Sequence, residues 1–158
     1  MRDSHAFLLQ RVQPAMVALI DGSLSTLAPI FSVAIVTHKP HYAFIAGLAA
    51  AFGAGISMAF SEGLSDTGEL TGRGNPVVRG GITGVGTFIG GILHTLPFLI
   101  PHYHAALFTA VAVVAFELLI LAWLRWRFFE VNFIRALASV TLGGIIIAGV
   151  SAALGSAG

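Results

Sequence analysis

The stretch Gly55–Asp66, GISMAFSEGLSD, begins in an apolar segment and ends in an acidic one. In a helix, Met58, Glu62 and Asp66 recur at every fourth position and so share one face. A thioether followed by two carboxylates, leading out of an apolar helix, indicates a path for a divalent metal ion. The same pattern also fits a methionine that fills a packing gap, followed by an ordinary polar helix end. The surrounding sequence decides between these interpretations.

The composition of the whole chain is that of an integral membrane protein. Of its 158 residues 56% are hydrophobic and only 9% are charged, whereas about 25% of a soluble domain is charged. The formal net charge of +1 gives no reason to expect nucleic-acid binding. Because the chain has no cysteine, disulfides, thiolate metal sites and iron–sulfur clusters are excluded.

Five apolar stretches are each long enough to cross a bilayer core, which takes about 20 helical residues. They are Ala15–Thr37, Tyr42–Phe60, Gly81–Ile100, Ala105–Leu124 and Phe133–Leu154. We therefore expect an all-α membrane domain over residues 15–158. Residues 1–14 are expected to form a short interfacial amphipathic helix rather than a signal peptide. Pro29 and Pro97 fall inside predicted spans and are expected to kink them.

Basic residues predict the orientation of these spans. With five spans, seven arginines share one side of the membrane, whereas Lys39 lies on the other. The seven are Arg2, Arg11, Arg73, Arg79, Arg125, Arg127 and Arg135. Since positive residues gather on the cytoplasmic side, the N-terminus is predicted to be cytoplasmic and the C-terminus external.

Glycines at intervals of four residues occur in the third predicted span. Gly80 and Gly84 form one such pair, and Gly86 and Gly90 form another. Small residues at this spacing let helix backbones approach closely within a membrane. The two pairs are explained equally well by packing inside one protomer and by a dimer interface.

Two acidic residues lie inside predicted spans, Asp21 in the first and Glu117 in the fourth. A carboxylate at the centre of a membrane helix costs about 2.5–3.5 kcal/mol unless it has a partner or a cavity. By depth, Asp21, Met58, Glu62 and, less directly, Glu117 fall in the cytoplasmic third of the membrane. Carboxylates with one thioether favour Fe²⁺ or Mn²⁺ over Ca²⁺. The alternative for Asp21 and Glu117 is a hydrogen-bonding role between helices.

The loop after the second span adds two more acidic residues. Asp66 and Glu69 join Glu62 to form an acidic mouth that suits metal capture on the cytoplasmic side. Because GELTGRGNP is rich in turn residues, an ordinary solvated loop is the other interpretation.

Histidines provide further candidates. His94 lies in the outer half of the third span, where it is either a hydrogen-bonded structural residue or, with Glu117, a proton relay or second site. Four more histidines lie in the outer loops and form either a weak metal-release site or an interfacial group with no such role. They are His38, His41, His102 and His104.

Motifs for catalysis are missing from the sequence. It contains no GxSxG, no HExxH and no phosphate-binding P-loop. A di-iron carboxylate centre would need Glu-x-x-His pairs on facing helices, and no glutamate here has a histidine three residues later. We therefore do not expect an enzyme.

Two motifs together resemble a known family. Ile20–Thr26 reads IDGSLST, and Gly53–Ala59 reads GAGISMA before EGLS at Glu62–Ser65. These segments resemble the vacuolar iron transporter (VIT/CCC) family. Within it, the stretch from Asp21 to Ile100, including LTGRG and HTLPFLI, is most similar to the VIT-like membrane domain of bacterial membrane-bound ferritins. The rubrerythrin-like domain that precedes that domain is not in this sequence.

The resemblance implies a homodimeric, proton-coupled carrier. It would export Fe²⁺, with Mn²⁺ as a further candidate, from the cytosol across the bacterial inner (plasma) membrane, without a tightly bound cofactor. Asp21 and Met58 would form the intramembrane metal path and Glu62 its cytoplasmic entrance. Eukaryotic members carry a long helical insertion between the second and third spans, which this chain lacks. Metal capture is therefore expected to be simpler or to use a separate ferritin-like partner. The alternative function is a non-transporting membrane scaffold that docks such a partner.

Overall fold

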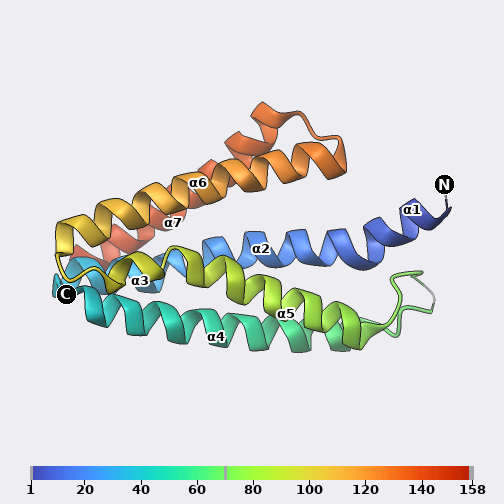
Figure 1. Cartoon of the computed structure of the whole chain (residues 1–158), viewed down its shortest axis with the longest axis horizontal. Helices are drawn as coiled ribbons and strands as arrows, with labels where there is room; N and C mark the ends of the chain where they lie inside the picture. Colours follow the sequence, from blue (N-terminus) through green and yellow to red (C-terminus); the bar gives the residue numbers. More distant parts are fainter. Residues whose placement is uncertain (1, 70, 157–158) are drawn as a thin grey trace.

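The computed structural model describes residues 2–69 and 71–156, and within them the chain is helical throughout, without strands. The elements are α1 (Arg2–Phe7), the π-helical turn η1 (Leu8–Val12), α2 (Gln13–Ser25), α3 (Leu27–Thr37), α4 (Pro40–Ser65), α5 (Pro76–Leu93), the 3₁₀ turn η2 (Leu96–Leu99), α6 (Tyr103–Phe129) and α7 (Phe133–Ser156). Figure 1 shows them as a bundle of long helices.

Five of these helical runs are long and apolar enough to cross a membrane, which confirms the predicted number of spans. The first run, His5–Thr37, joins the N-terminal segment, α2 and α3. The N-terminal residues therefore continue directly into the first span through η1 rather than forming a separate helix.

The two prolines behave differently. Pro29 follows a break at Thr26, where α2 ends and α3 begins. The break is expected because proline has no N–H to donate to the carbonyl of Ser25. The kink expected at Pro97 is wrong, because α5 already ends at Leu93 and Pro97 lies in η2.

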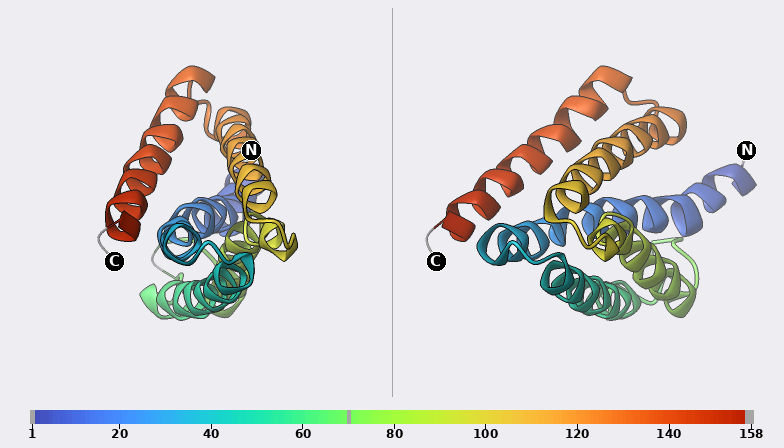
Figure 2. Two further views of the ribbon diagram at one scale, coloured as in Figure 1. Left: turned by 90° about the vertical axis from the view of Figure 1, so that its left-hand side faces the viewer. Right: turned by 60° about the vertical axis from the view of Figure 1, so that its left-hand side comes forward.

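The first span lies between two helical hairpins (Figure 2). In the α4–α5 hairpin, α5 makes most of the contacts, and it packs against α2 of the first span. In the α6–α7 hairpin, α7 makes most of the contacts, and it packs against α3. The N-terminus, loop 66–75 and loop 130–132 gather at one end of the bundle, which we call the basic end (right in Figure 1). The opposite end holds residues 38–39 and 94–102, and we call it the histidine end. The arginines lie toward the basic end and Lys39 at the histidine end, as the sequence predicts.

Helix α5 is buried along its small and polar side. A Cβ atom added to Gly80 or Gly84 would lie 2.7 Å from atoms of Ala59 in α4. Added to Gly86 or Gly90, it would lie 2.7 Å from atoms of α2. Both glycine pairs therefore allow close helix packing inside the protomer, which decides between the two interpretations left open by the sequence.

Candidate functional site

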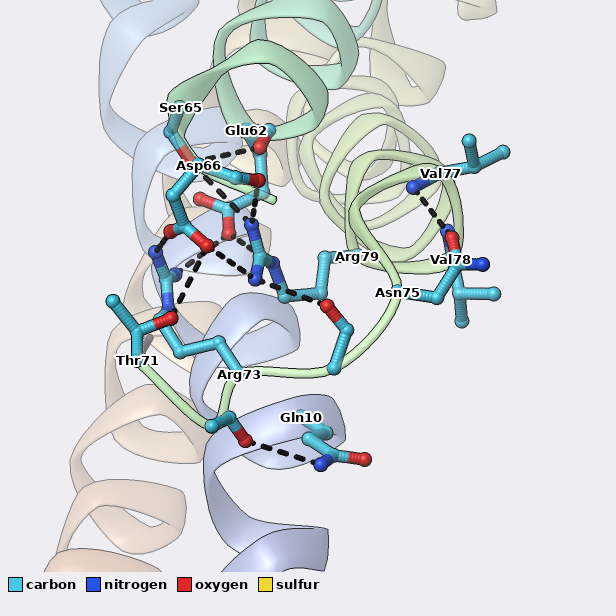
Figure 3. Close-up of polar contacts among 12 residues, drawn as sticks. Gln10, Glu62, Ser65, Asp66, Thr71, Arg73, Asn75, Val77, Val78 and Arg79 are labelled. Atoms are coloured by element: carbon cyan, nitrogen blue, oxygen red, sulfur yellow. Dashed lines mark hydrogen bonds and ion pairs between the residues drawn. The ribbon is translucent and has the colours of Figure 1, made fainter. Parts of the chain in front are cut away.

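Two carboxylates and two guanidinium groups form a cluster at the basic end (Figure 3). Arg73 Nη2 lies 2.6 Å from Glu62 Oε1, and Arg73 Nη1 lies 3.2 Å from Asp66 Oδ2. Arg79 Nε lies 2.9 Å from the same oxygen of Glu62, and Arg79 Nη1 lies 3.3 Å from Asp66 Oδ1. We call these four residues the arginine–carboxylate cluster.

Helix ends bring this cluster together. Helix α4 ends at Ser65, and Asp66 has an extended backbone with φ of −163°. Asp66 therefore does not continue the helical face of Met58 and Glu62, and that part of the predicted stripe is wrong. Helix α5 begins at Pro76, where the side chain of Asn75 accepts hydrogen bonds from two backbone N–H groups. This cap starts α5 so that Arg79 lies in its first turns, beside the end of α4.

The cluster is electrically balanced. Arg79 is buried, with a relative exposure of 1%. Burial raises the pKa of Asp66, but hydrogen bonds from Thr71, Arg79 and the backbone of Gly68, with the charge of Arg79, outweigh this and lower it. Glu69 is exposed and forms no ion pair with the described residues. Two of the three acids of the predicted mouth thus meet, but a cation must compete with arginines to reach them.

Asp21 and Met58 lie on neighbouring helices, and both are partly exposed on the protomer. Gly22 packs against the backbone of Thr87, and Ala59 packs against Gly84. Since Thr87 and Gly84 are separated by about one helical turn, roughly 5 Å, the two candidate ligands lie at similar levels of the bundle. Asp21 forms no hydrogen bond or ion pair with any side chain that the structure describes.

His94 and Glu117 form a second ionisable group in the bundle interior. His94 Nδ1 lies 3.0 Å from Glu117 Oε2, and His94 Nε2 lies 2.9 Å from Thr26 Oγ1. The hydroxyl of Thr26 donates in turn to the carbonyl oxygen of Gly22 at 2.8 Å. The relative exposure is 0% for both His94 and Thr26 and 5% for Glu117. Both ring nitrogens of His94 thus have a hydrogen-bond partner, and a proton-relay role with Glu117 stays a prediction.

The position of Glu117 corrects its predicted depth. Arg79 contacts Glu62, and His94 follows Arg79 by about four helical turns, or roughly 22 Å along α5. Glu117 therefore does not belong to the same level as Glu62. Sequence reasoning grouped His94 and Glu117 as a candidate proton relay but placed them in different halves of the membrane, so it did not predict their direct contact. The available signal was that each is an isolated ionisable residue in a span and so needs a partner.

The histidine end carries the loop histidines. His38, His41, Lys39 and Phe98 line part of a groove with a volume of about 510 Å³. The ring of His38 lies 4.8 Å from that of Tyr103, centroid to centroid, and the ring of His104 lies 5.1 Å from it. The loop histidines thus pack partly on an aromatic ring.

In the part of the chain that the structure describes, no three His, Cys, Asp or Glu side chains come together as a metal-binding group. Comparisons of the chain with protein-family models, curated proteins and solved structures find no match. The ionisable groups that the structure places within the bundle or at its basic end are Asp21 near the level of Met58, the arginine–carboxylate cluster and the His94–Glu117 pair.

Proposed function

We propose that this protein is a homodimeric membrane carrier that exports Fe²⁺, with Mn²⁺ as a further substrate, from the cytosol in exchange for protons. The observation that carries the proposal is Asp21, a carboxylate inside a span without a partner among the described side chains. An ionisable residue in a membrane span is costly, and such residues mark ion pathways. Met58 at a neighbouring level adds a thioether, so that this donor set suits a borderline divalent ion.

The partial exposure of Asp21 supports a dimer. A partly exposed carboxylate within a membrane span is unfavourable, so a second copy would be needed to cover it. Helix α4 presents a stripe of small residues at intervals of four, Gly53, Ser57 and Ser61, and all three are exposed on the protomer. Such stripes favour close helix contacts in membranes. A dimer that covers this face of α4 would also approach Met58.

The arginine–carboxylate cluster fits the metal entrance of such a carrier. Glu62 lies one turn beyond Met58 on α4, at the basic end. Its carboxylate is held by Arg73 and Arg79, so an arriving cation would exchange with a guanidinium rather than enter an open acidic mouth. At Asp66 the cation would likewise have to displace an arginine. Glu69 is exposed and would only attract cations to this end of the protein.

Metal flux into proteoliposomes tests the proposal directly. Purified protein is reconstituted, and uptake of Mn²⁺ and Fe²⁺ is followed by a dye trapped in the lumen. We expect uptake by the native protein and a loss of at least about tenfold in the uptake rate of Asp21→Asn, because the variant lacks the charge that would attract the cation. Glu130→Gln is the matched control, because Glu130 is an exposed carboxylate at the end of α6.

The alternative function is a non-transporting scaffold for a separate ferritin-like protein. The ion pairs of Glu62 and Asp66 with arginines favour this alternative. In a scaffold, the cluster would serve only to hold the connection between α4 and α5. Folded protein that moves neither metal would reject the carrier and leave this alternative.

A further inference from the structure

Among the described residues, His94 and Glu117 form no hydrogen bond or ion pair with Asp21, Met58 or Glu62 of the proposed metal path. We infer that this pair holds the proton that the carrier exchanges for its metal ion, an inference that rests on the proposed function. The pair is the most deeply buried contact between a histidine and a carboxylate among the described residues.

Counting hydrogens shows that one proton lies between the two side chains. The single hydroxyl hydrogen of Thr26 is donated to the carbonyl of Gly22, so Thr26 Oγ1 can only accept from His94 Nε2. Nε2 therefore carries a hydrogen. Nδ1 then either accepts a proton from neutral Glu117 or, in the imidazolium, donates one to the carboxylate. In both states one proton lies between Nδ1 and Oε2, and the pair has no net charge.

This balance makes the pair a one-proton store. Removal of the shared proton leaves a buried negative charge beside the lone pair of Nδ1, and addition of a second proton leaves a buried positive charge. Both are unfavourable in an apolar interior. The proton is thus exchanged only when a compensating charge moves nearby, which is what coupling to a metal ion requires.

Glu117 also offers a route for this exchange. Its Oε1 atom is buried and has no hydrogen-bond partner among the described residues. Thr83 Oγ1 and Thr87 Oγ1 share this property and follow Arg79 on one face of α5 at intervals of four residues. Buried hydroxyls without partners are typical positions for bridging water. They would connect the pair with the basic end, and the transferred proton would leave Oε2 or Nδ1 for a water oxygen.

The break in the first span links the proton store to the metal site. Thr26, the partner of His94, is the residue at which α2 gives way to α3. Asp21 lies on the same helix, little more than one turn earlier. A change in the charge of His94 alters its bond to Thr26 and thereby the helix that carries Asp21.

No other charged group of the described residues lies in a position to balance a charge on His94 or Glu117 by a direct contact. Asp21 on α2 is the nearest along the chain to Thr26, and α3 and η2 have no titratable residue. The remaining titratable or charged groups of the adjacent helices are His41, Tyr42 and Glu62 on α4, Arg79 on α5, Tyr103, His104, Arg125 and Arg127 on α6, and Arg135 on α7. None of them forms a hydrogen bond or ion pair with His94 or Glu117 in the described structure.

The first test separates metal movement from proton coupling. Mn²⁺ is the probe, and uptake is measured both down its own gradient and against it under a pH gradient. One exchanged proton changes the accumulation ratio about tenfold for each pH unit. We expect Glu117→Gln to keep downhill uptake and to lose this pH dependence, whereas Glu130→Gln retains both. Native dependence on pH in Glu117→Gln would overturn the inference. If that variant does not fold, His94→Gln replaces it, with the same expectations.

The second test does not require transport. Infrared difference spectra of the full protein in vesicles are recorded as the pH is raised. We expect a titrating band of the shared proton, either the C=O stretch of protonated Glu117 or a ring mode of doubly protonated His94. This band should disappear or move in Glu117→Gln and in His94→Gln. The absence of both bands from the native protein would overturn the inference. A titrating band in protein that moves no Mn²⁺ would instead reject transport and keep the proton site.

Discussion

The arginine–carboxylate cluster and the His94–Glu117 pair both neutralise carboxylates, but they do so with different cations. A guanidinium group has only donors, so Arg73 and Arg79 cannot take up a proton from Glu62 or Asp66. An imidazole has a nitrogen that can accept a proton, so His94 can share one with Glu117. The cluster therefore resists change at the basic end, whereas the pair provides a movable proton in the interior. The kind of cation therefore decides whether a proton can pass between the carboxylate and its partner.

The largest effect is expected when the buried cation of the cluster is removed. Arg79→Met leaves Glu62 without its buried partner and should lower the free energy of unfolding by about 3 kcal/mol. Thermal unfolding in detergent measures this loss. Arg73→Met is the matched control, because Arg73 is half-exposed and should cost about 1 kcal/mol or less. Equal losses in the two variants would contradict the assignment of Arg79 as the fixed centre.

The next effect concerns the backbone that supports the pair. Gly22 accepts the hydrogen bond of Thr26, and an added Cβ would overlap the carbonyl of Thr87. Gly22→Ala should therefore separate α2 from α5 and lower the free energy of unfolding by about 1–3 kcal/mol. Gly149→Ala on α7 is the control, since an added Cβ there meets nothing within 4 Å. Unchanged stability in Gly22→Ala would show that the contact between α2 and α5 is loose.

The difference in stability between two variants of Glu117 should be smaller still. It distinguishes the contribution of the hydrogen bond to His94 from that of the charge. Glu117→Leu leaves Nδ1 of His94 buried without a partner and should cost about 1–3 kcal/mol. Glu117→Gln can donate an N–H to the same nitrogen and should cost less than that. Thermal unfolding of the two variants at one pH makes the comparison. A Gln variant as unstable as the Leu variant would indicate that charge, and not hydrogen bonding, holds the pair together.

The spans were predictable from the sequence because each is a predominantly apolar run of sufficient length, and Pro29 marked the break between α2 and α3. The direct contact between His94 and Glu117 was not predictable from the sequence. It depends on the axial offset of two helices, and both predicted boundaries were displaced. Helix α5 ends at Leu93, before the predicted Ile100, and α6 extends to Phe129, so that Glu117 lies in its middle.

The cluster was predictable only in part, for a different reason. Its acidic members, Glu62 and Asp66, are only four residues apart in the sequence, so their proximity was predictable even though Asp66 lies beyond the end of α4. Their neutralisation did not, because it requires the loop to return Arg73 and the first turns of α5 to return Arg79. Turn-rich segments leave that path undetermined until the glycines at positions 68, 72 and 74 adopt positive φ angles.

The smallest expected effect is the pH dependence of the cluster. The pKa of Asp66 is lowered in the folded protein, so the unfolded chain binds a proton at a higher pH than the folded one. The stabilisation is therefore complete above the ordinary aspartate pKa of about 3.9 and is lost as the pH falls through the lower, folded value. Thermal unfolding across the acidic range should show this loss in the native protein and less of it in Asp66→Asn. Glu69→Gln should follow the native protein, because Glu69 is exposed and unpaired among the described residues. An identical acid profile in Asp66→Asn would mean that Arg79 is held by Glu62 alone, and the contrast between a fixed and a titrating site would then depend on that one ion pair.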